Sequence, residues 1–195
     1  MRITVVAGIV AAAIWIIVKM IFFYTMEVGY DITPLILLNM FLLLGGISVG
    51  LYISKLREKE ETNALHDIKE GMKSGVPYAV IVAVFIYFYY DQIDPEYNAH
   101  RIAEMEYMYH NELMDPEKVK LVKEANPDFE VLSNEQIEKN LIDSYRRSTS
   151  ANSTFVLALL GMVVLSAMNS IFVTIIYRKV VFRPRANSPG VSNGK

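Results

Sequence analysis

Four long apolar stretches, separated by charged segments, constrain the fold of this chain more than any other feature of its sequence. A helix needs roughly 20 apolar residues to cross a bilayer core about 30 Å thick. Charge that alternates in blocks with such stretches suits a chain that passes repeatedly between lipid and water. The sequence therefore predicts an all-α polytopic membrane protein, with four transmembrane helices in a bundle. The predicted spans are about 3–24, 35–53, 72–90 and 155–177.

The first and third stretches each carry a feature that needs interpretation. A basic residue before the first apolar run is typical of a secretory signal peptide, but this run is longer than a usual signal-peptide core. Bulky Phe22, Phe23 and Tyr24 also stand where a peptidase would require small residues. We therefore expect an uncleaved span. The strictly apolar part of the third stretch, 76–90, is short, and Pro77 lies near its start.

The distribution of lysine and arginine predicts the orientation. The 25–34 loop has neither residue, and short loops rich in both stay in the cytoplasm. We therefore expect a bacterial inner-membrane protein with both termini and a solvated 54–75 loop inside. The tail 184–195, rich in Pro, Ser, Asn and Gly, is expected to be disordered and cytoplasmic. The basic residues that decide this are Lys55, Arg57, Lys59, Lys69 and Lys73 in the loop, and Arg178, Lys179, Arg183, Arg185 and Lys195 after the fourth span.

Residues 91–154 are predicted to form a helical extracytoplasmic segment between the third and fourth spans. Asp94 and Asp115 each precede a proline and a glutamate, the pattern of an N-cap followed by proline at the first helical position. Ser133 and Gln136 form a capping-box pattern that opens a further helix. The sequence is equally compatible with this helix ending before the fourth span and with its running into it.

The same segment carries apolar residues at helical spacing amid fourteen acidic and seven basic residues. A region of this size buries little core by itself. Its apolar stripes are therefore expected to pack against each other, against a second copy of the chain or against the bilayer surface. The stripes comprise Ile102, Met105, Tyr109 and Leu113, then Ile137, Leu141 and Tyr145.

Lys19 is the one basic residue deep inside a predicted span. An intramembrane charge is a functional hypothesis by default. Lys19 lies close to the end of its span, however, and a lysine stem can extend until its amine reaches the interface. Such snorkelling is the favoured interpretation.

Small and uncharged polar residues in the spans are candidates for helix packing. Glycines or serines spaced four apart let two helices approach closely, and amide side chains can bond across helices. Packing inside one bundle is favoured over a ligand site, and a dimer interface is the main rival. The candidates are Gly46 with Gly50, Ser166 with Ser170, and the two asparagines Asn39 and Asn169.

No constellation of residues predicts catalysis, a cofactor or a metal. His100 with Glu104, and Glu106 with His110, are helical i,i+4 pairs, but the two histidines are too far apart along a helix to share one ion without other ligands. The chain lacks a phosphate-binding glycine loop, a zinc-protease motif and any cysteine. No basic excess indicates nucleic-acid binding, and no predicted span contains an acidic residue at depth to serve a proton-coupled transporter.

Several short motifs accompany the four predicted spans: Gly71 and Gly75 before the third span, Ile93-Asp94-Pro95-Glu96 after it, the helix start 133–138, Gly161 in the last span, and Arg178-Lys179 at its end. With these motifs the chain resembles a bacterial membrane family, found chiefly in Bacteroidota, that is catalogued as domain of unknown function 4199. This resemblance implies an inner-membrane location and a four-helix bundle, and it brings no activity, cofactor or catalytic residue.

These features together predict a single membrane domain over 1–183 and a non-enzymatic function. The favoured function is an accessory or scaffold module that acts through its 91–154 segment and its small-residue helix faces. Besides the lipid bilayer, its partner would be a second copy of the chain or another subunit of a membrane complex. The alternative is a small oligomeric transporter or permeability factor.

Overall fold

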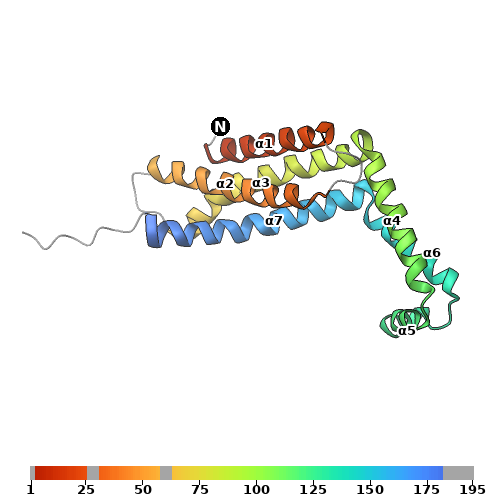
Figure 1. Ribbon diagram of the computed structural model, residues 1–195. Coiled ribbons are helices and arrows are strands. Elements are labelled where there is room, and N and C mark those ends of the chain that lie inside the picture. Colours follow the sequence, from red (N-terminus) through yellow and green to blue (C-terminus); the bar gives the residue numbers. More distant parts are fainter. Residues whose placement is uncertain (1–2, 26–30, 58–62, 182–195) are drawn as a thin grey trace, which may run out of the picture. The chain divides into compact units, whose positions relative to one another are not determined.

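The computed structural model describes residues 3–25, 31–57 and 63–181, and every regular element in this part of the chain is helical (Figure 1). The predicted all-α polytopic bundle with a helical insertion is thereby confirmed, whereas the predicted tail 184–195 lies outside the described residues. The helices long and apolar enough to span a membrane are α1 (Ile3–Thr25), α2 (Thr33–Arg57), α3 (Ala64–Phe88) with its π-helical continuation η1 (Tyr89–Ile93), and α7 (Ala151–Ile176) with its π-helical continuation η3 (Tyr177–Val181).

Helix α3 begins at Ala64, well before the apolar stretch 72–90 that predicted it. The amide of His66 donates to the Asn63 side chain at 2.8 Å, and this bond supports the first turn of the helix. At the start of α2, the amide of Thr33 donates to Asp31 Oδ1 at 2.9 Å. Hydrogen bonding from the Thr33 side chain, together with this amide bond, holds the pKa of Asp31 below its usual value.

The segment between the third and fourth spans forms a helical hairpin of α4 (Pro95–Leu113), α5 (Pro116–Ala125) and α6 (Asn134–Ser148), with a 3₁₀ turn, η2 (Pro127–Phe129), after α5. The three predicted helix starts are confirmed. Asp94 accepts from the Tyr97 amide, Asp115 accepts from the Glu117 amide, and Ser133 with Gln136 makes both bonds of a capping box.

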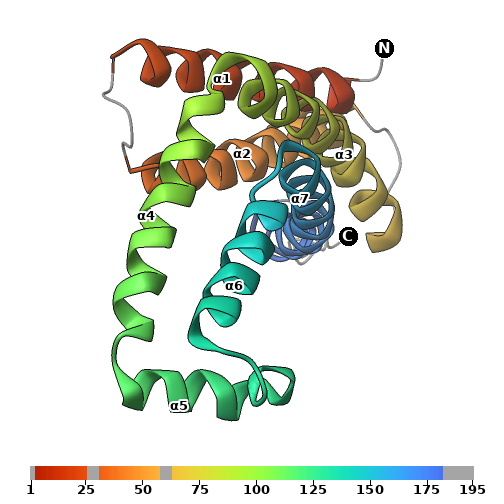
Figure 2. The same cartoon turned by 90° about the vertical axis from the view of Figure 1, so that its right-hand side faces the viewer.

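Helices α4 and α6 run side by side, and α5 joins their far ends (Figure 2). Their apolar stripes pack against each other, with Leu113 and Ile137 buried at the contact. Arg146 also pairs with Glu106 at 3.3 Å across the two helices. The hairpin therefore has a small core of its own.

Helix α6 and the fourth span are separate helices, because α6 ends at Ser148 and α7 begins at Ala151. The hydroxyls of Ser148 and Thr149 donate back to the Tyr145 carbonyl, at 2.8 and 2.9 Å. Ser150 Oγ accepts from the Ser153 amide at 3.3 Å, which caps α7. Side chains that bond their own backbone in this way compete with a continuous helix, and this settles the alternative that the sequence left open.

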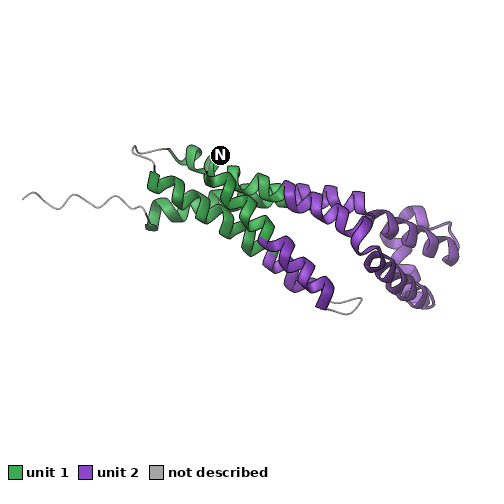
Figure 3. Ribbon diagram, turned by 90° about the horizontal axis from the view of Figure 1, so that it is seen from above, with its two compact units in different colours: residues 1–13, 39–79, 162–195 green, residues 14–38, 80–161 purple. Residues whose placement is uncertain are grey.

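The chain divides into two compact units (Figure 3). Unit 1 comprises 1–13, 39–79 and 162–195, and unit 2 comprises 14–38 and 80–161. Unit 1 contains one part of each of the four spanning helices, and unit 2 contains the other parts together with the hairpin.

Within unit 1, α3 is the helix that the other three approach most closely. A methyl group added at Gly8 of α1 would collide with the Ser74 carbonyl oxygen, and one added at Gly75 would lie 2.7 Å from Ser166 of α7. Ile47 of α2 is fully buried beside Gly75. The absence of side chains at these two glycines lets helices of the bundle meet almost backbone to backbone.

Candidate functional site

The first candidate site, in unit 2, is a cage of aromatic rings around Lys19. The Lys19 side chain is only 3% exposed. Its amine lies 4.1 Å from the ring centre of Tyr89, 5.5 Å from that of Tyr90 and 5.8 Å from that of Tyr97. Snorkelling was therefore the wrong interpretation. The electron-rich faces of the three rings stabilise the ammonium inside the protein instead of interfacial water.

The wide turn η1 and the start of α4 hold this cage together. The Tyr89 hydroxyl donates to Asp94 Oδ2 at 2.8 Å, and the Asp94 amide donates to the Tyr89 carbonyl at 2.8 Å. Asp94 Oδ1 accepts from the Tyr97 amide at 3.2 Å. A single carboxylate thus ends η1, caps α4 and places negative charge near Lys19. Short π-helical turns such as η1 are frequent at functional positions.

No direct signal in the sequence predicts this arrangement. Tyr89 and Tyr90 look like ordinary interfacial aromatics at the end of a span, and Tyr97 lies on the polar helix that follows. The only local hints are the lysine within an apolar run and the N-cap pattern at Asp94. Which rings surround the lysine depends on how α1 packs against η1 and α4.

The second candidate site, in unit 1, is an ion-pair cluster centred on Asp67 of α3, whose side chain is 1% exposed. Lys55 of α2 lies 2.6 Å from Oδ1, and Arg178 of η3 lies 2.6 Å from Oδ2. Glu70, also buried, pairs with Lys73 and accepts a hydrogen bond from the Thr4 hydroxyl of α1 at 3.5 Å. The beginning of α3 is therefore bonded to all three other spanning helices.

This cluster corrects one prediction. The 54–75 loop was expected to be solvated, but Asp67 and Glu70 are buried inside helix α3. Both carboxylates lie in the first two turns of the candidate span Ala64–Ile93, so they do not contradict the prediction that the spans lack acidic residues at depth. A prediction from hydropathy alone assigns Asp67 and Glu70 to a loop, because charged residues lower the mean hydropathy. The buried carboxylates are tolerated because cations on neighbouring helices compensate them.

A line of polar side chains continues from this cluster along α3. The Ser74 hydroxyl donates to the Gly46 carbonyl at 2.9 Å. The Tyr78 hydroxyl bonds Asn39 of α2, with 2.6 Å to the side-chain oxygen. The Asn39 amide in turn donates to the sulfur of Met162 at 3.6 Å. Each polar group is therefore satisfied by a neighbouring helix, as a buried polar group in lipid requires.

The structure places the small-residue candidates at contacts within unit 1. Gly46 and Gly50 lie against α1, where added methyl groups would sit 3.1 Å from Ala11 Cβ and 3.3 Å from Thr4 Cα. Ser166 and Ser170 lie against Gly75 and Gly71 of α3. Their hydroxyls donate to carbonyls one turn earlier in α7, at 2.7 Å. Asn169 is half-buried.

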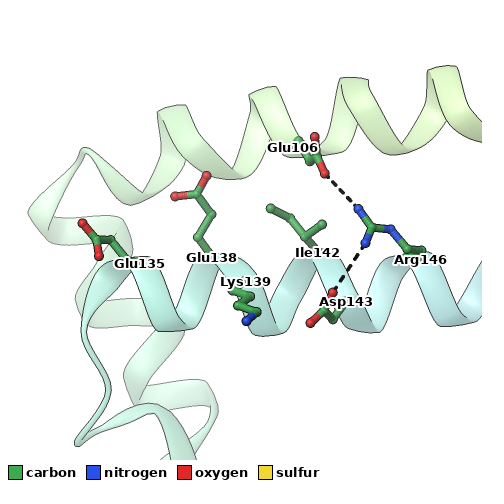
Figure 4. A pocket seen from close by; sticks show the side chains of 7 residues that line it. All are labelled: Glu106, Glu135, Glu138, Lys139, Ile142, Asp143 and Arg146. Atoms are coloured by element: carbon green, nitrogen blue, oxygen red, sulfur yellow. Dashed lines mark hydrogen bonds and ion pairs between the residues drawn. The ribbon is translucent and has the colours of Figure 1, made fainter.

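The hairpin offers a third, more open feature. Figure 4 shows a groove of about 340 Å³ between α4 and α6, in which Arg146 lies between Glu106 and Asp143. His110 pairs with Glu138 at 3.2 Å, and His100 is 43% exposed beside Glu104. Over the described residues, no group of three potential His, Cys, Asp or Glu ligands is placed to hold a metal ion.

Comparison with known proteins identifies a family for this chain. No curated protein and no solved structure matches the chain. Residues 6–179 match the family described as "Protein of unknown function (DUF4199)". This match runs from α1 through the hairpin into η3, and so includes both Lys19 and the Asp67 cluster. The chain therefore belongs to the DUF4199 family.

Proposed function

We propose that this protein is a non-enzymatic scaffold of the bacterial inner membrane that presents its α4–α6 hairpin to another subunit of a membrane complex. In this proposal both termini lie in the cytoplasm and the hairpin lies on the opposite side. The bundle serves as the anchor, and the hairpin makes the contact.

The Lys19 cage is the observation that carries the proposal. A buried ammonium is costly in a span unless its partners are fixed around it. Here those partners are residues at the base of the hairpin: Tyr89 and Tyr90 of η1 and Tyr97 of α4. The cage therefore attaches the hairpin to α1 by cation–π contacts, in addition to the covalent connection along the chain. A module that must present a surface in a fixed orientation needs such a rigid attachment.

The packing of unit 1 supports the same function. The helices meet at glycines, and the buried carboxylates are matched by cations and hydroxyls. Such an interior favours a rigid anchor over a solute path. The basic residues at the ends of α2 and η3 support the proposed orientation, because lysine and arginine are retained in the cytoplasm.

Cysteine labelling tests the orientation directly, because the natural chain has no cysteine. In intact cells, a membrane-impermeant maleimide should label the variant Asp128→Cys, in the hairpin, without permeabilisation. The variant Leu65→Cys, at the start of α3, should be labelled only after permeabilisation. The opposite pattern would exclude the proposed orientation.

Photo-crosslinking tests the scaffold function. A photoreactive residue at Tyr107, which is 73% exposed on α4, should form a discrete adduct when the protein is expressed at its native level. The variant Lys19→Met should weaken that adduct without reducing the amount of protein in the membrane. Lys120→Met, which removes an exposed lysine of α5, is the matched control and should leave the adduct unchanged. A protein that forms no adduct and purifies alone as a monomer in mild detergent would contradict the proposal.

The polar line in unit 1 favours a second candidate, an oligomeric transporter or permeability factor. Ser74, Tyr78 and Asn39 lie in succession within the bundle, and an internal polar path is what a small carrier needs. Liposomes containing the protein should then release entrapped ions faster than empty ones. Asn39→Leu should abolish the release, and the exposed hairpin change Asn111→Leu should not. Liposomes that contain the protein and release ions no faster than empty ones would exclude this candidate.

A further inference from the structure

Helices α2 and α7 lie side by side within unit 1, and we call the line between them the α2–α7 seam. Their contacts follow one register along the seam. Asn39 contacts Met162, and the Tyr177 hydroxyl donates to the Ser48 carbonyl at 2.9 Å. The rings of Tyr52 and Tyr177 then meet at 6.2 Å. In this parallel register, the residues that follow Tyr52 and Tyr177 lie at the same level.

The end of the seam exposes aromatic, apolar and cationic side chains in succession. Tyr52 is 41% exposed, and the apolar side chains of Leu56 and Val180 are 61% and 71% exposed. Arg57 and Lys179 are exposed at the same level. Tyrosines favour the headgroup level of a bilayer, apolar side chains favour acyl chains, and cations favour phosphate. This combination matches a membrane–water boundary occupied by lipid.

Among the described residues, these two cations form no ion pair. Lys55 and Arg178, just beside them, are engaged by Asp67. Over the described part of the chain, no carboxylate lies within ion-pair distance of Arg57 or Lys179. Asp67 and Glu70 are the only acidic side chains described in unit 1, and both are buried. The seam therefore ends in exposed positive charge.

The chain ends α7 at this point with the π-helical turn η3, Tyr177–Val181. This wide turn carries Tyr177 and Lys179 of the seam and also Arg178 of the Asp67 cluster. Short π-helical turns are frequent at functional positions. Here η3 supplies one cation to the interior and the next one to the surface.

We propose that the end of the α2–α7 seam binds the headgroup of an anionic phospholipid. Arg57 and Lys179 hold the phosphate, Tyr52 lies at the glycerol level, and Leu56 and Val180 contact the acyl chains. This lipid site is independent of the proposed scaffold function, because it uses only unit 1 and none of the hairpin.

Phosphatidylglycerol and phosphatidylcholine, each titrated into the full-length protein in mild detergent, test the proposal. Native mass spectrometry counts the bound lipid, and the shift in the apparent melting temperature reports the affinity. The expected result is retained phosphatidylglycerol and a melting shift that phosphatidylcholine does not produce. Arg57→Gln and Lys179→Gln should each weaken binding about fivefold, the contribution of one cation near an anionic headgroup. Lys69→Gln removes an exposed lysine from α3, outside the seam, and should leave binding unchanged.

Three results would overturn the proposal. Equal weakening by all three variants would mean diffuse attraction to exposed basic residues in general, and not binding at the seam. Unchanged binding in Arg57→Gln and Lys179→Gln would remove the seam from the interaction. Inorganic phosphate that reproduces the melting shift would identify a free anion, and not a lipid, as the ligand. Equal melting temperatures of all variants in phosphatidylcholine show that the comparison concerns correctly folded protein.

Discussion

Neutralising Asp67 is the sharpest test of the ion-pair cluster in unit 1. The change Asp67→Asn preserves the size of the side chain and removes the charge that two cations share. Lys55 is then left with a 13% exposed side chain and no carboxylate at Asp67 to compensate it, and Arg178 loses the same partner at 37% exposure. An uncompensated buried charge is far more costly than the loss of an exposed pair.

The exposures decide the magnitude. Breaking a buried ion pair by removing one partner costs roughly 3–5 kcal/mol. Loss of the more exposed ion pair, between Asp67 and Arg178, adds only about 0–1 kcal/mol, because water screens it. We therefore expect Asp67→Asn to lower the free energy of unfolding by about 3 kcal/mol, the lower end of the range. For a chain of this length that corresponds to a melting temperature lowered by on the order of 10 °C. Lys55→Met should cost less, since Arg178 still compensates Asp67.

Thermal unfolding in mild detergent, followed by circular dichroism, measures these effects. Asp128→Asn, the same chemical change at an exposed position of η2, is the matched control and should stay within about 0.5 kcal/mol of the natural protein. The double variant Lys55→Met with Asp67→Asn should be less destabilised than the sum of the single variants. An Asp67→Asn protein as stable as the control, or strictly additive single changes, would refute the assignment of Asp67 as the centre of the cluster.

Three further changes test other contacts. Gly8→Ala should destabilise the bundle by about 1–3 kcal/mol, since the new methyl group meets the Ser74 carbonyl, whereas Gly161→Ala, which meets nothing, should be neutral or stabilising in the same unfolding assay. Lys19→Met should speed hydrogen exchange at the start of α4, because about 2 kcal/mol of desolvated cation–π attraction is lost; unchanged exchange would contradict a role in holding the hairpin. Ser133→Ala should cost α6 about 1 kcal/mol, seen as faster exchange in its first turn, with no effect on α4.

Much of the fold was predictable because its signals are local. An apolar run of sufficient length must be a spanning helix, and the N-caps at Asp94, Asp115 and Ser133 act through bonds to residues two or three positions later. The break between α6 and α7 is also local in origin. It was left open because hydroxyls at 148–150 are compatible with a bent continuous helix as well as with two helices.

The candidate sites were harder to predict because they depend on contacts between distant segments. Hydropathy placed Asp67 in a loop, since a carboxylate lowers the score of any window whether or not a cation compensates it. Only the position of Lys55 on α2 and of Arg178 on η3 makes its burial favourable. Lys19 was misinterpreted for the same reason: the sequence shows only that it lies near the end of its span, whereas its partners come from η1 and α4.

The Lys19 cage also has a consequence for the order in which the protein is assembled. Lys19 enters the membrane with the first span, whereas Tyr89, Tyr90 and Tyr97 are synthesised only at the end of the third. During that interval the rings of the cage are absent, and extending toward the interface is the lowest-energy option for the lysine. Contacts between α1 and α2, such as the hydrogen bond from the Trp15 indole to the Leu35 carbonyl, can form before the cage does. The cage is therefore a late addition to the packing of α1, made only after Tyr97 of α4 has been synthesised.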